Sequence, residues 1–131
     1  MTDTSSTNAA SPLGDLPRLE DLSTYFLAFL YPGPAYDGFP PKAPEQAAIQ
    51  QAHMAYVWRI QQPGGPAIAG GPVVSEGGAA KNEAPPVGMS ILRCKSQAEA
   101  ERVAASDPGV AAGRFRVMVY RWLVPAGRLP V

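Results

Sequence analysis

The chain has 131 residues, enough for one domain, and its 11 basic and 11 acidic residues give a formal net charge of zero. This balance, without a clustered basic face, argues against nucleic acid as a partner. No apolar run approaches the roughly 18–20 residues that span a bilayer, and the polar N-terminus lacks the apolar core of a secretory signal. We therefore expect a cytoplasmic protein without a membrane partner. The single Cys94 excludes an intramolecular disulfide and fits a reducing compartment.

The expected domain bounds follow from composition. Residues 1–20 are rich in Ser, Thr, Asn, Ala and Pro and lack apolar periodicity, so we expect a flexible N-terminal tail. The folded domain is predicted over residues 21–125, with residues 126–131 as a C-terminal tail. Its first segment, residues 23–31, is aromatic and aliphatic on both alternating faces and predicts a strand. The Pro- and Gly-rich loop that follows is longer than most connections, and such loops are often functional.

The next segment predicts an amphipathic helix that begins at Pro44 and ends before Pro63. His53, the only histidine, falls within the inward stripe of this helix. An imidazole at such a position is either a core residue with satisfied hydrogen bonds or the working group of a pocket. The stripe is made of apolar residues at three- and four-residue steps: Ile49, Ala52, Tyr56 and Ile60.

A second strand is predicted over residues 66–76, and the Gly-Gly-Pro sequence at 70–72 indicates a bulge or a sheet edge within it. A polar loop at 76–86 follows. It leads to a third predicted strand over residues 87–95, in which Cys94 is expected as a small buried residue.

The second helix is predicted over residues 96–106, because Ser96 and Glu99 form a capping box. The Asp-Pro-Gly sequence at 107–109 is expected to end this helix. A last apolar segment, residues 115–124, predicts the fourth strand.

The element order β-α-β-β-α-β is the signature of a ferredoxin-like α+β fold, a four-stranded antiparallel sheet with two helices on one face. The first and fourth strands are apolar on both sides, so the second face of the sheet lacks cover from this chain. A large apolar surface needs a partner, and a second copy is the simplest one. We therefore predict a homodimer of the dimeric α+β barrel type, with the sheets packed face to face.

Asp107 favours the interpretation of His53 as the working group of a pocket, because a carboxylate can fix the tautomer of an imidazole or stabilise its charged form. Free imidazole has a pKa of about 6.5, which suits proton transfer at neutral pH. In the alternative reading, His53 donates to a backbone carbonyl and Asp107 accepts backbone amides. Three arginines near the fourth strand are expected in solvent or at the rim of a pocket: Arg114, Arg116 and Arg121.

We expect no metal and no cofactor. One histidine and one cysteine fall short of the three or four ligands that a metal site needs. The glycine pairs also lack the strand-to-helix spacing of a phosphate-binding loop.

Between about Tyr25 and Trp122 the chain resembles the YCII-related domain family. The motifs that carry the resemblance are LYPGP after the first strand, the helical His53, AGGPV at 69–73, ILRCKSQAEAERVAASDP at 91–108 and AGRF at 112–115. The resemblance implies a ferredoxin-like α+β domain that dimerises through its sheets.

The resemblance also implies a pocket that contains His53 and the Asp107 of the Asp-Pro pair, and it maps the Gly-Pro of the second strand to Gly71 and Pro72. The family includes a dehydrochlorinase of a chlorinated hydroxyhydroquinone. We therefore expect acid–base chemistry by His53 and Asp107 on a small cyclic or aromatic molecule, with Tyr56, Gly71 and Pro72 in the pocket. Two alternatives stay open: a non-catalytic ligand-binding or accessory domain, and a structural interaction module.

Overall fold

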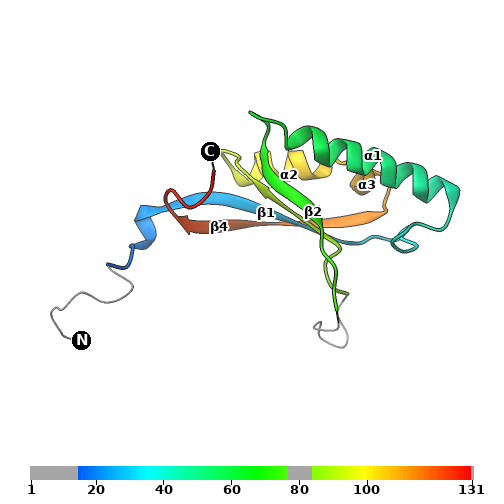
Figure 1. The fold of residues 1–131 in the computed structure, drawn as a ribbon, viewed down its shortest axis with the longest axis horizontal. Coiled ribbons are helices and arrows are strands. Elements are labelled where there is room, and N and C mark those ends of the chain that lie inside the picture. Colours follow the sequence, from blue (N-terminus) through cyan, green and yellow to red (C-terminus); the bar gives the residue numbers. More distant parts are fainter. Residues whose placement is uncertain (1–14, 77–83, 131) are drawn as a thin grey trace.

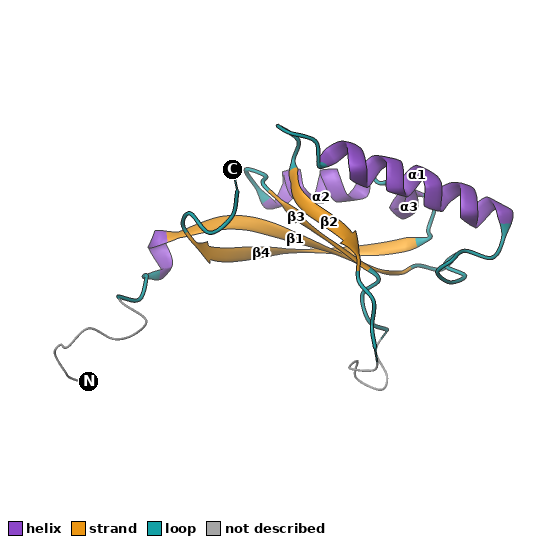
Figure 2. Ribbon diagram, in the orientation of Figure 1, coloured by secondary structure: helices purple, strands orange, loops and turns teal. Residues whose placement is uncertain are grey.

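The computed structural model describes residues 15–76 and 84–130, which form a four-stranded antiparallel sheet with helices on one face (Figure 1, Figure 2). The strand order β2-β3-β1-β4 confirms the predicted ferredoxin-like α+β fold. No helix in these ranges is long and apolar enough to cross a membrane. Most of the predicted N-terminal tail and of the predicted loop at 76–86 lies outside the described residues.

The elements are η1 (Leu19–Asp21), β1 (Leu22–Pro32), α1 (Pro44–Ile60), β2 (Ala67–Pro72), β3 (Gly88–Leu92), α2 (Gln97–Ala105), α3 (Pro108–Ala111) and β4 (Phe115–Pro125).

The core lies between the helices and one face of the sheet. β1 and β4 pair along their whole length, and residues in register share a face, so Ala28 lies beside Val119 and Leu30 beside Val117. This face packs against the helices, and the small side chains of α2 allow a close approach. The buried core residues are Phe26, Ala28, Ala67, Leu92, Ala100 and Ala104.

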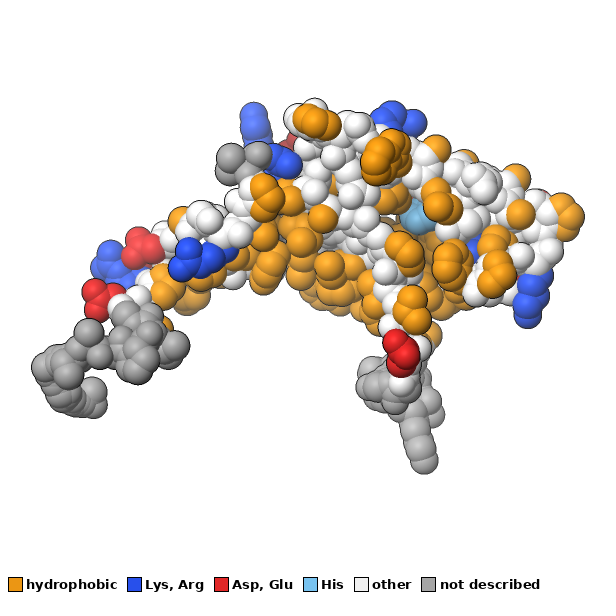
Figure 3. Space-filling view, in the orientation of Figure 1, with side chains coloured by type: hydrophobic (Ala, Val, Ile, Leu, Met, Phe, Trp, Pro, Cys, Tyr) orange, Lys and Arg blue, Asp and Glu red, His pale blue; other side chains and the backbone are white. Residues whose placement is uncertain are grey.

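The other face of the sheet, called here the open face, is not covered by any described helix (Figure 2). Its side chains alternate with those of the core face. They are Tyr25, Leu27, Phe29 and Tyr31 of β1, Met89 and Ile91 of β3, and Met118, Tyr120 and Trp122 of β4. Met118 is 45% exposed and Tyr120 is 46% exposed, and apolar atoms cover the underside of the sheet in Figure 3. The first and fourth strands are thus apolar on both faces, as the sequence predicted.

α1 begins at Pro44 as predicted, but the apolar stripe assigned to it is partly wrong. Ala52 is exposed, whereas the two buried residues of the helix are the polar Gln46 and Gln50. The physical reason is a buried arginine, Arg114, which requires hydrogen-bond acceptors on the inner side of the helix.

β2 is an edge strand, as predicted, and one side chain ties its outer backbone groups to the end of α1. Gln61 Nε2 donates to Gly70 O at 3.1 Å, and the Gly70 N–H donates to Gln61 Oε1 at 3.0 Å. These bonds satisfy groups that an edge strand otherwise leaves to solvent. The register shift falls between Ala67 and Ala69 rather than at the Gly-Gly-Pro sequence.

Gly33 lies just after β1, where the backbone packs against the residues that lead into β4. Its N–H donates to Arg114 O at 2.8 Å, and an added Cβ would lie 2.4 Å from Gly113 O. We expect Gly33→Ala to lower the free energy of unfolding by about 1–3 kcal/mol, because backbone atoms cannot move aside as a flexible side chain can. Chemical denaturation measures this loss.

Gly71→Ala is the matched control for Gly33→Ala. Apart from Gly71 itself and its two chain neighbours, no atom of the described residues lies within 4 Å of a Cβ built on Gly71. The free energy of unfolding should therefore change by about 0.5 kcal/mol or less. Equal losses in the two variants would contradict the importance of the Gly33 contact.

Candidate functional site

His53 and Asp107 come together from the middle of α1 and from the turn before α3. His53 Nδ1 lies 2.6 Å from Asp107 Oδ2, and the two side chains are 12% and 6% exposed. Because a carboxylate only accepts, a neutral imidazole in this bond carries its proton on Nδ1 and leaves Nε2 as the free acceptor. The structure therefore brings together the two residues that the sequence predicted as a pair.

Asp107 is held in place by the short helix that it begins. Its Oδ1 accepts the Gly109 N–H at 2.8 Å, the usual contact of an N-cap residue, so that Oδ2 is left for His53. The Asp-Pro-Gly sequence ends α2 as predicted, but it also begins α3, which the sequence analysis missed. Proline at a first helical position is the signal that indicates such a start.

Phe115, the first residue of β4, packs against the imidazole. The ring centroids of His53 and Phe115 are 4.7 Å apart, with an angle of 53° between the ring planes. Gly109 permits this arrangement, because an added Cβ there would lie 2.6 Å from Cδ2 of Phe115. The orientation of His53 is thus restrained by a carboxylate and by an aromatic ring.

His53 lines a cavity of about 650 Å³, and Gly71 and Pro72 at the end of β2 line it as well. Small-molecule sites usually measure roughly 300–1,000 Å³. In Figure 3 the imidazole lies in a hollow between apolar side chains. Three large apolar residues of the lining are strongly exposed: Phe39 at 60%, Trp58 at 69% and Val74 at 72%.

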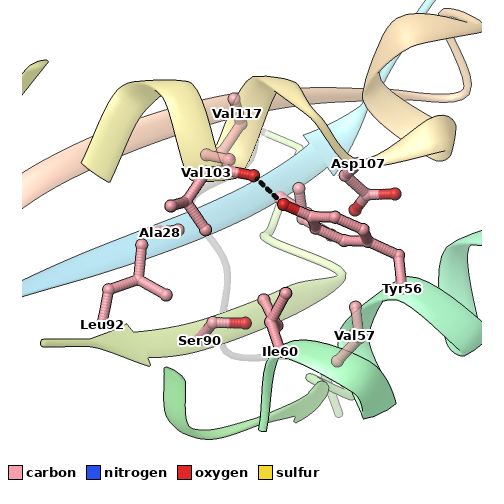
Figure 4. Close-up of a pocket in the computed structure, with 11 residues that line it drawn as sticks. Ala28, Tyr56, Val57, Ile60, Ser90, Leu92, Val103, Asp107 and Val117 are labelled. Atoms are coloured by element: carbon pink, nitrogen blue, oxygen red, sulfur yellow. Dashed lines mark hydrogen bonds between the residues drawn. The ribbon is translucent and has the colours of Figure 1, made fainter. Parts of the chain in front are cut away.

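Tyr56, which the sequence analysis placed in the same pocket, faces a different space. Its phenol donates to Val103 O at 2.6 Å, and with Asp107 it lines a smaller cavity of about 30 Å³ (Figure 4). A buried hydroxyl needs an acceptor, and the Val103 carbonyl on α2 supplies it. Burial raises the pKa of the Tyr56 phenol, so this group stays protonated at neutral pH and joins α1 to α2.

Arg114 is fully buried and lines the large cavity together with His53. Its Nε donates to Gln50 Oε1 at 2.9 Å, and its Nη1 donates to Gln46 Oε1 at 3.2 Å. The compensating charge comes from Asp37, whose Oδ1 lies 3.3 Å from Nη1. Nη2 donates to a backbone carbonyl of the loop before α1 at 2.8 Å.

The expectation of a solvated or rim position is confirmed for Arg116 and Arg121, which are exposed, but it is wrong for Arg114. A turn at Gly113, with φ of +77°, precedes Arg114, and the Tyr36 ring covers the guanidinium at 4.8 Å. The signal that could have located this site is the pair of glutamines four residues apart on α1, which share one side of a helix.

Asp37 links the loop before α1 to the buried arginine. Its Oδ2 accepts the N–H groups of Ala43 at 2.7 Å and of Lys42 at 3.1 Å, while Oδ1 faces Arg114. The Ala43 N–H has the largest effect on the pKa of Asp37 and, with the Lys42 N–H and the charge of Arg114, holds it below the ordinary value against desolvation. The long Pro- and Gly-rich loop therefore supplies the counter-charge of the site.

A carboxylate whose pKa is lowered by folding stabilises the folded state only while it is ionised. We expect the contribution of Asp37 to be present at neutral pH and to be lost as the pH falls from about the ordinary value of 3.8 through the lower pKa of the folded protein. The melting temperatures of wild type and Asp37→Asn, measured from about pH 7 to about pH 3, should therefore converge toward acid.

Glu101→Gln, on the exposed side of α2, controls for the loss of one negative charge. A difference between wild type and Asp37→Asn that stays constant over the whole pH range would contradict the role given to Asp37.

Among residues 15–76 and 84–130, no three His, Cys, Asp or Glu side chains lie close enough to hold a metal ion. Cys94 was predicted within the third strand, but β3 ends at Leu92 and Cys94 lies half-buried beyond it. Burial raises the pKa of the Cys94 thiol, which makes it a poor nucleophile at neutral pH.

Comparison with known protein families identifies the family of this chain. The profile of the YCII-related domain matches residues 25–123, most of the chain. The chain belongs to the YCII-related family. This confirms the resemblance that the sequence motifs indicated. No curated protein matches the sequence of this YCII-related protein.

A solved structure with a similar fold is that of 5-chloro-2-hydroxyhydroquinone dehydrochlorinase from Burkholderia phenoliruptrix, in complex with 2,5-dihydroxybenzoquinone. The two proteins are 22% identical, with a TM-score of 0.52, and the match covers 75% of this chain and 92% of that chain. At this identity the similarity supports the fold of the YCII-related protein.

Proposed function

We propose that this YCII-related protein is an enzyme that uses His53 and Asp107 for acid–base chemistry on a small cyclic molecule. The observation that carries the proposal is the 2.6 Å contact between His53 Nδ1 and Asp107 Oδ2 beside a cavity of about 650 Å³. A histidine that serves only the core needs a hydrogen-bond acceptor but no access to a cavity. His53 has both a buried carboxylate partner and a place in the cavity wall.

The proposed reaction begins when Nε2 of the neutral imidazole takes a proton from a hydroxyl group or an acidic carbon of the substrate. The electron pair of the broken bond stays on the substrate as a phenolate or enolate, and Asp107 stabilises the imidazolium that forms. Return of the proton to another carbon completes an isomerisation. In a dehydrochlorination of an aromatic ring, the proton is returned to the chlorine-bearing carbon, and loss of a second hydroxyl proton then expels chloride. The substrate thus loses HCl overall, and no oxidant or reductant is needed.

The cavity favours a flat ring with oxygen substituents as the substrate. Its exposed part offers the aromatic surfaces of Phe39 and Trp58, while its buried part contains His53, Gln50 and Arg114. The ligand of the structurally similar dehydrochlorinase, a dihydroxyquinone, has this character. We therefore propose hydroquinone- or quinone-type rings as the substrate class.

Chloride release from 5-chloro-2-hydroxyhydroquinone tests the acid–base function. We expect wild type to release chloride and His53→Gln to do so at least about 100-fold more slowly, because this is the usual contribution of a general acid–base group. Asp107→Asn should also be slow. An amide that donates to Nδ1 leaves the imidazole proton on Nε2, so Nε2 can no longer take a proton from the substrate. The double variant should be scarcely slower than the slower single variant, because the two residues act together.

Ser106→Ala is the control for these variants. Ser106 precedes Asp107 in the sequence but does not line the cavity. The variant removes a hydroxyl that donates to Arg102 O, so its rate should stay within about twofold of wild type. Melting temperatures show that each variant is folded. Binding of 2,5-dihydroxybenzoquinone without turnover, or losses that add in the double variant, would favour the non-catalytic ligand-binding alternative.

We also propose that the protein is a homodimer built through the open face. Soluble monomers rarely expose a contiguous apolar surface of this kind. The side chains there are already ordered against one another, as in the edge-to-face contact of Phe29 and Tyr120 at 5.9 Å between centroids. Arg116 lies 5.6 Å from the Tyr31 ring centroid and supplies a charged group for the rim of an interface.

Light scattering at micromolar concentration tests the dimer. Met118→Lys and Tyr120→Lys each put a charge on the open face and should give monomers, because a buried unpaired charge is costly at an interface. Ala48→Lys, at an exposed position of α1, is the control and should leave the dimer intact. Dimers in both open-face variants would show that the interface lies elsewhere.

A further inference from the structure

The side-chain amide of Gln50 has a fixed orientation, because its oxygen faces a group that can only donate. Arg114 Nε donates to Gln50 Oε1 at 2.9 Å, and a guanidinium has no acceptor atom. The reversed amide would direct N–H groups against N–H groups. The Nε2 end of Gln50 must therefore point away from the arginine.

Gln50 is 9% exposed, and it lines the same cavity as His53. Among the hydrogen bonds of the described residues, its Oε1 accepts from Arg114 and its Nε2 donates none. Buried amide donors are nearly always paired, because an unpaired donor loses its bonds to water. The two N–H groups of Gln50 are thus donors available to a molecule in this cavity.

Gln46 contacts Arg114 as Gln50 does, but it differs from Gln50 in its position relative to the cavity. It makes the same kind of contact, accepting from Arg114 Nη1 at 3.2 Å, and it is 7% exposed. It does not line the cavity, whereas Gln50 does. Both glutamines therefore stabilise the buried charge, and Gln50 alone of the two can also contact a bound molecule.

Gln50 lies next to His53 on the surface of α1, because residues three apart share one face of a helix. A ligand atom that is bonded to Gln50 is consequently held close to the imidazole. The charge of Arg114 on the oxygen side of the amide polarises it and strengthens its N–H donors. Gln50 thus supplies a hydrogen-bond donor for a ligand oxygen, and His53 supplies a base for a nearby proton.

We propose that Gln50 Nε2 donates a hydrogen bond to an oxygen of the bound molecule, a carbonyl, enolate or phenolate oxygen next to the atom on which His53 acts. Gln50 then determines specificity, selecting rings that carry an oxygen acceptor over plain apolar rings, and Arg114 is a positioning residue that aims the amide. The role of His53 in this statement rests on the proposed function, but the test measures binding and needs no turnover.

Two matched variants test the proposal. Gln50→Glu keeps an acceptor for Arg114 but replaces the N–H donors with an oxygen that repels a ligand oxygen. Gln46→Glu makes the same change and adds the same charge outside the cavity. The dissociation constants of 2,5-dihydroxybenzoquinone and of toluene, a ring without oxygen, are measured for each protein by NMR titration.

We expect Gln50→Glu to weaken binding of the dihydroxyquinone at least about tenfold and Gln46→Glu to change it by less than about twofold. The affinity for toluene should change by less than about twofold in both variants. Gln50→Met removes the donors without adding a charge, but it also removes the acceptor of Arg114 Nε. Compared with Gln46→Met, which removes the acceptor of Nη1, it should show the same preference, and it serves where Gln50→Glu does not fold.

Three results would overturn the proposal: equal weakening by the Gln50 and Gln46 variants, equal weakening for the two probes, or a wild-type protein that binds toluene but not the dihydroxyquinone. The expected binding pattern without any turnover by wild type would refute the acid–base function and still support the role of Gln50.

Discussion

Burial of the Arg114 guanidinium constrains the whole side of the domain on which the candidate site lies. Removing this charge from water is costly unless hydrogen bonds and an opposite charge compensate for it. The compensation comes from segments far away in the sequence, since α1 supplies Gln46 and Gln50 and the loop before α1 supplies Asp37. All of these groups must be in place together. The arginine therefore determines how α1 is rotated over the start of β4 and where the preceding loop lies.

The same constraint positions the pair of His53 and Asp107. Because Gln50 and His53 share one face of α1, fixing the rotation of the helix through the glutamines also fixes the direction of the imidazole. Phe115 follows Arg114 directly and packs on the imidazole, while Asp107 reaches it from the start of α3. His53, Asp107 and Phe115 are thus carried by a helix, a helix cap and a strand, which favours precise geometry.

The elements with local signals could be predicted from the sequence, and the inner side of α1 could not. Strand alternation, the proline at position 44 and the capping box are local patterns, so the order of the four strands and the two longer helices, and the start of each of these helices, were predicted correctly. The inward stripe assumed that buried positions are apolar, which placed Ala52 inside. Gln46 and Gln50 are buried because of a charge more than 60 residues away, and no periodicity in one segment contains that information. The residues alone suggested that Asp107 could serve His53 but left the core alternative open, and the family resemblance added support for the pair.

The cavity has two regions of different polarity. Its exposed part is apolar and includes Phe39 and Trp58, so it contributes contact area that depends little on the substituents of a ring. Its buried part contains Gln50 and His53, where hydrogen bonds are stronger because water is excluded. If the proposed function holds, a change at the exposed part alters which ring fits, while the requirement for an oxygen and a transferable proton stays with α1. The proposed acid–base chemistry could then be retained while the substrate changes.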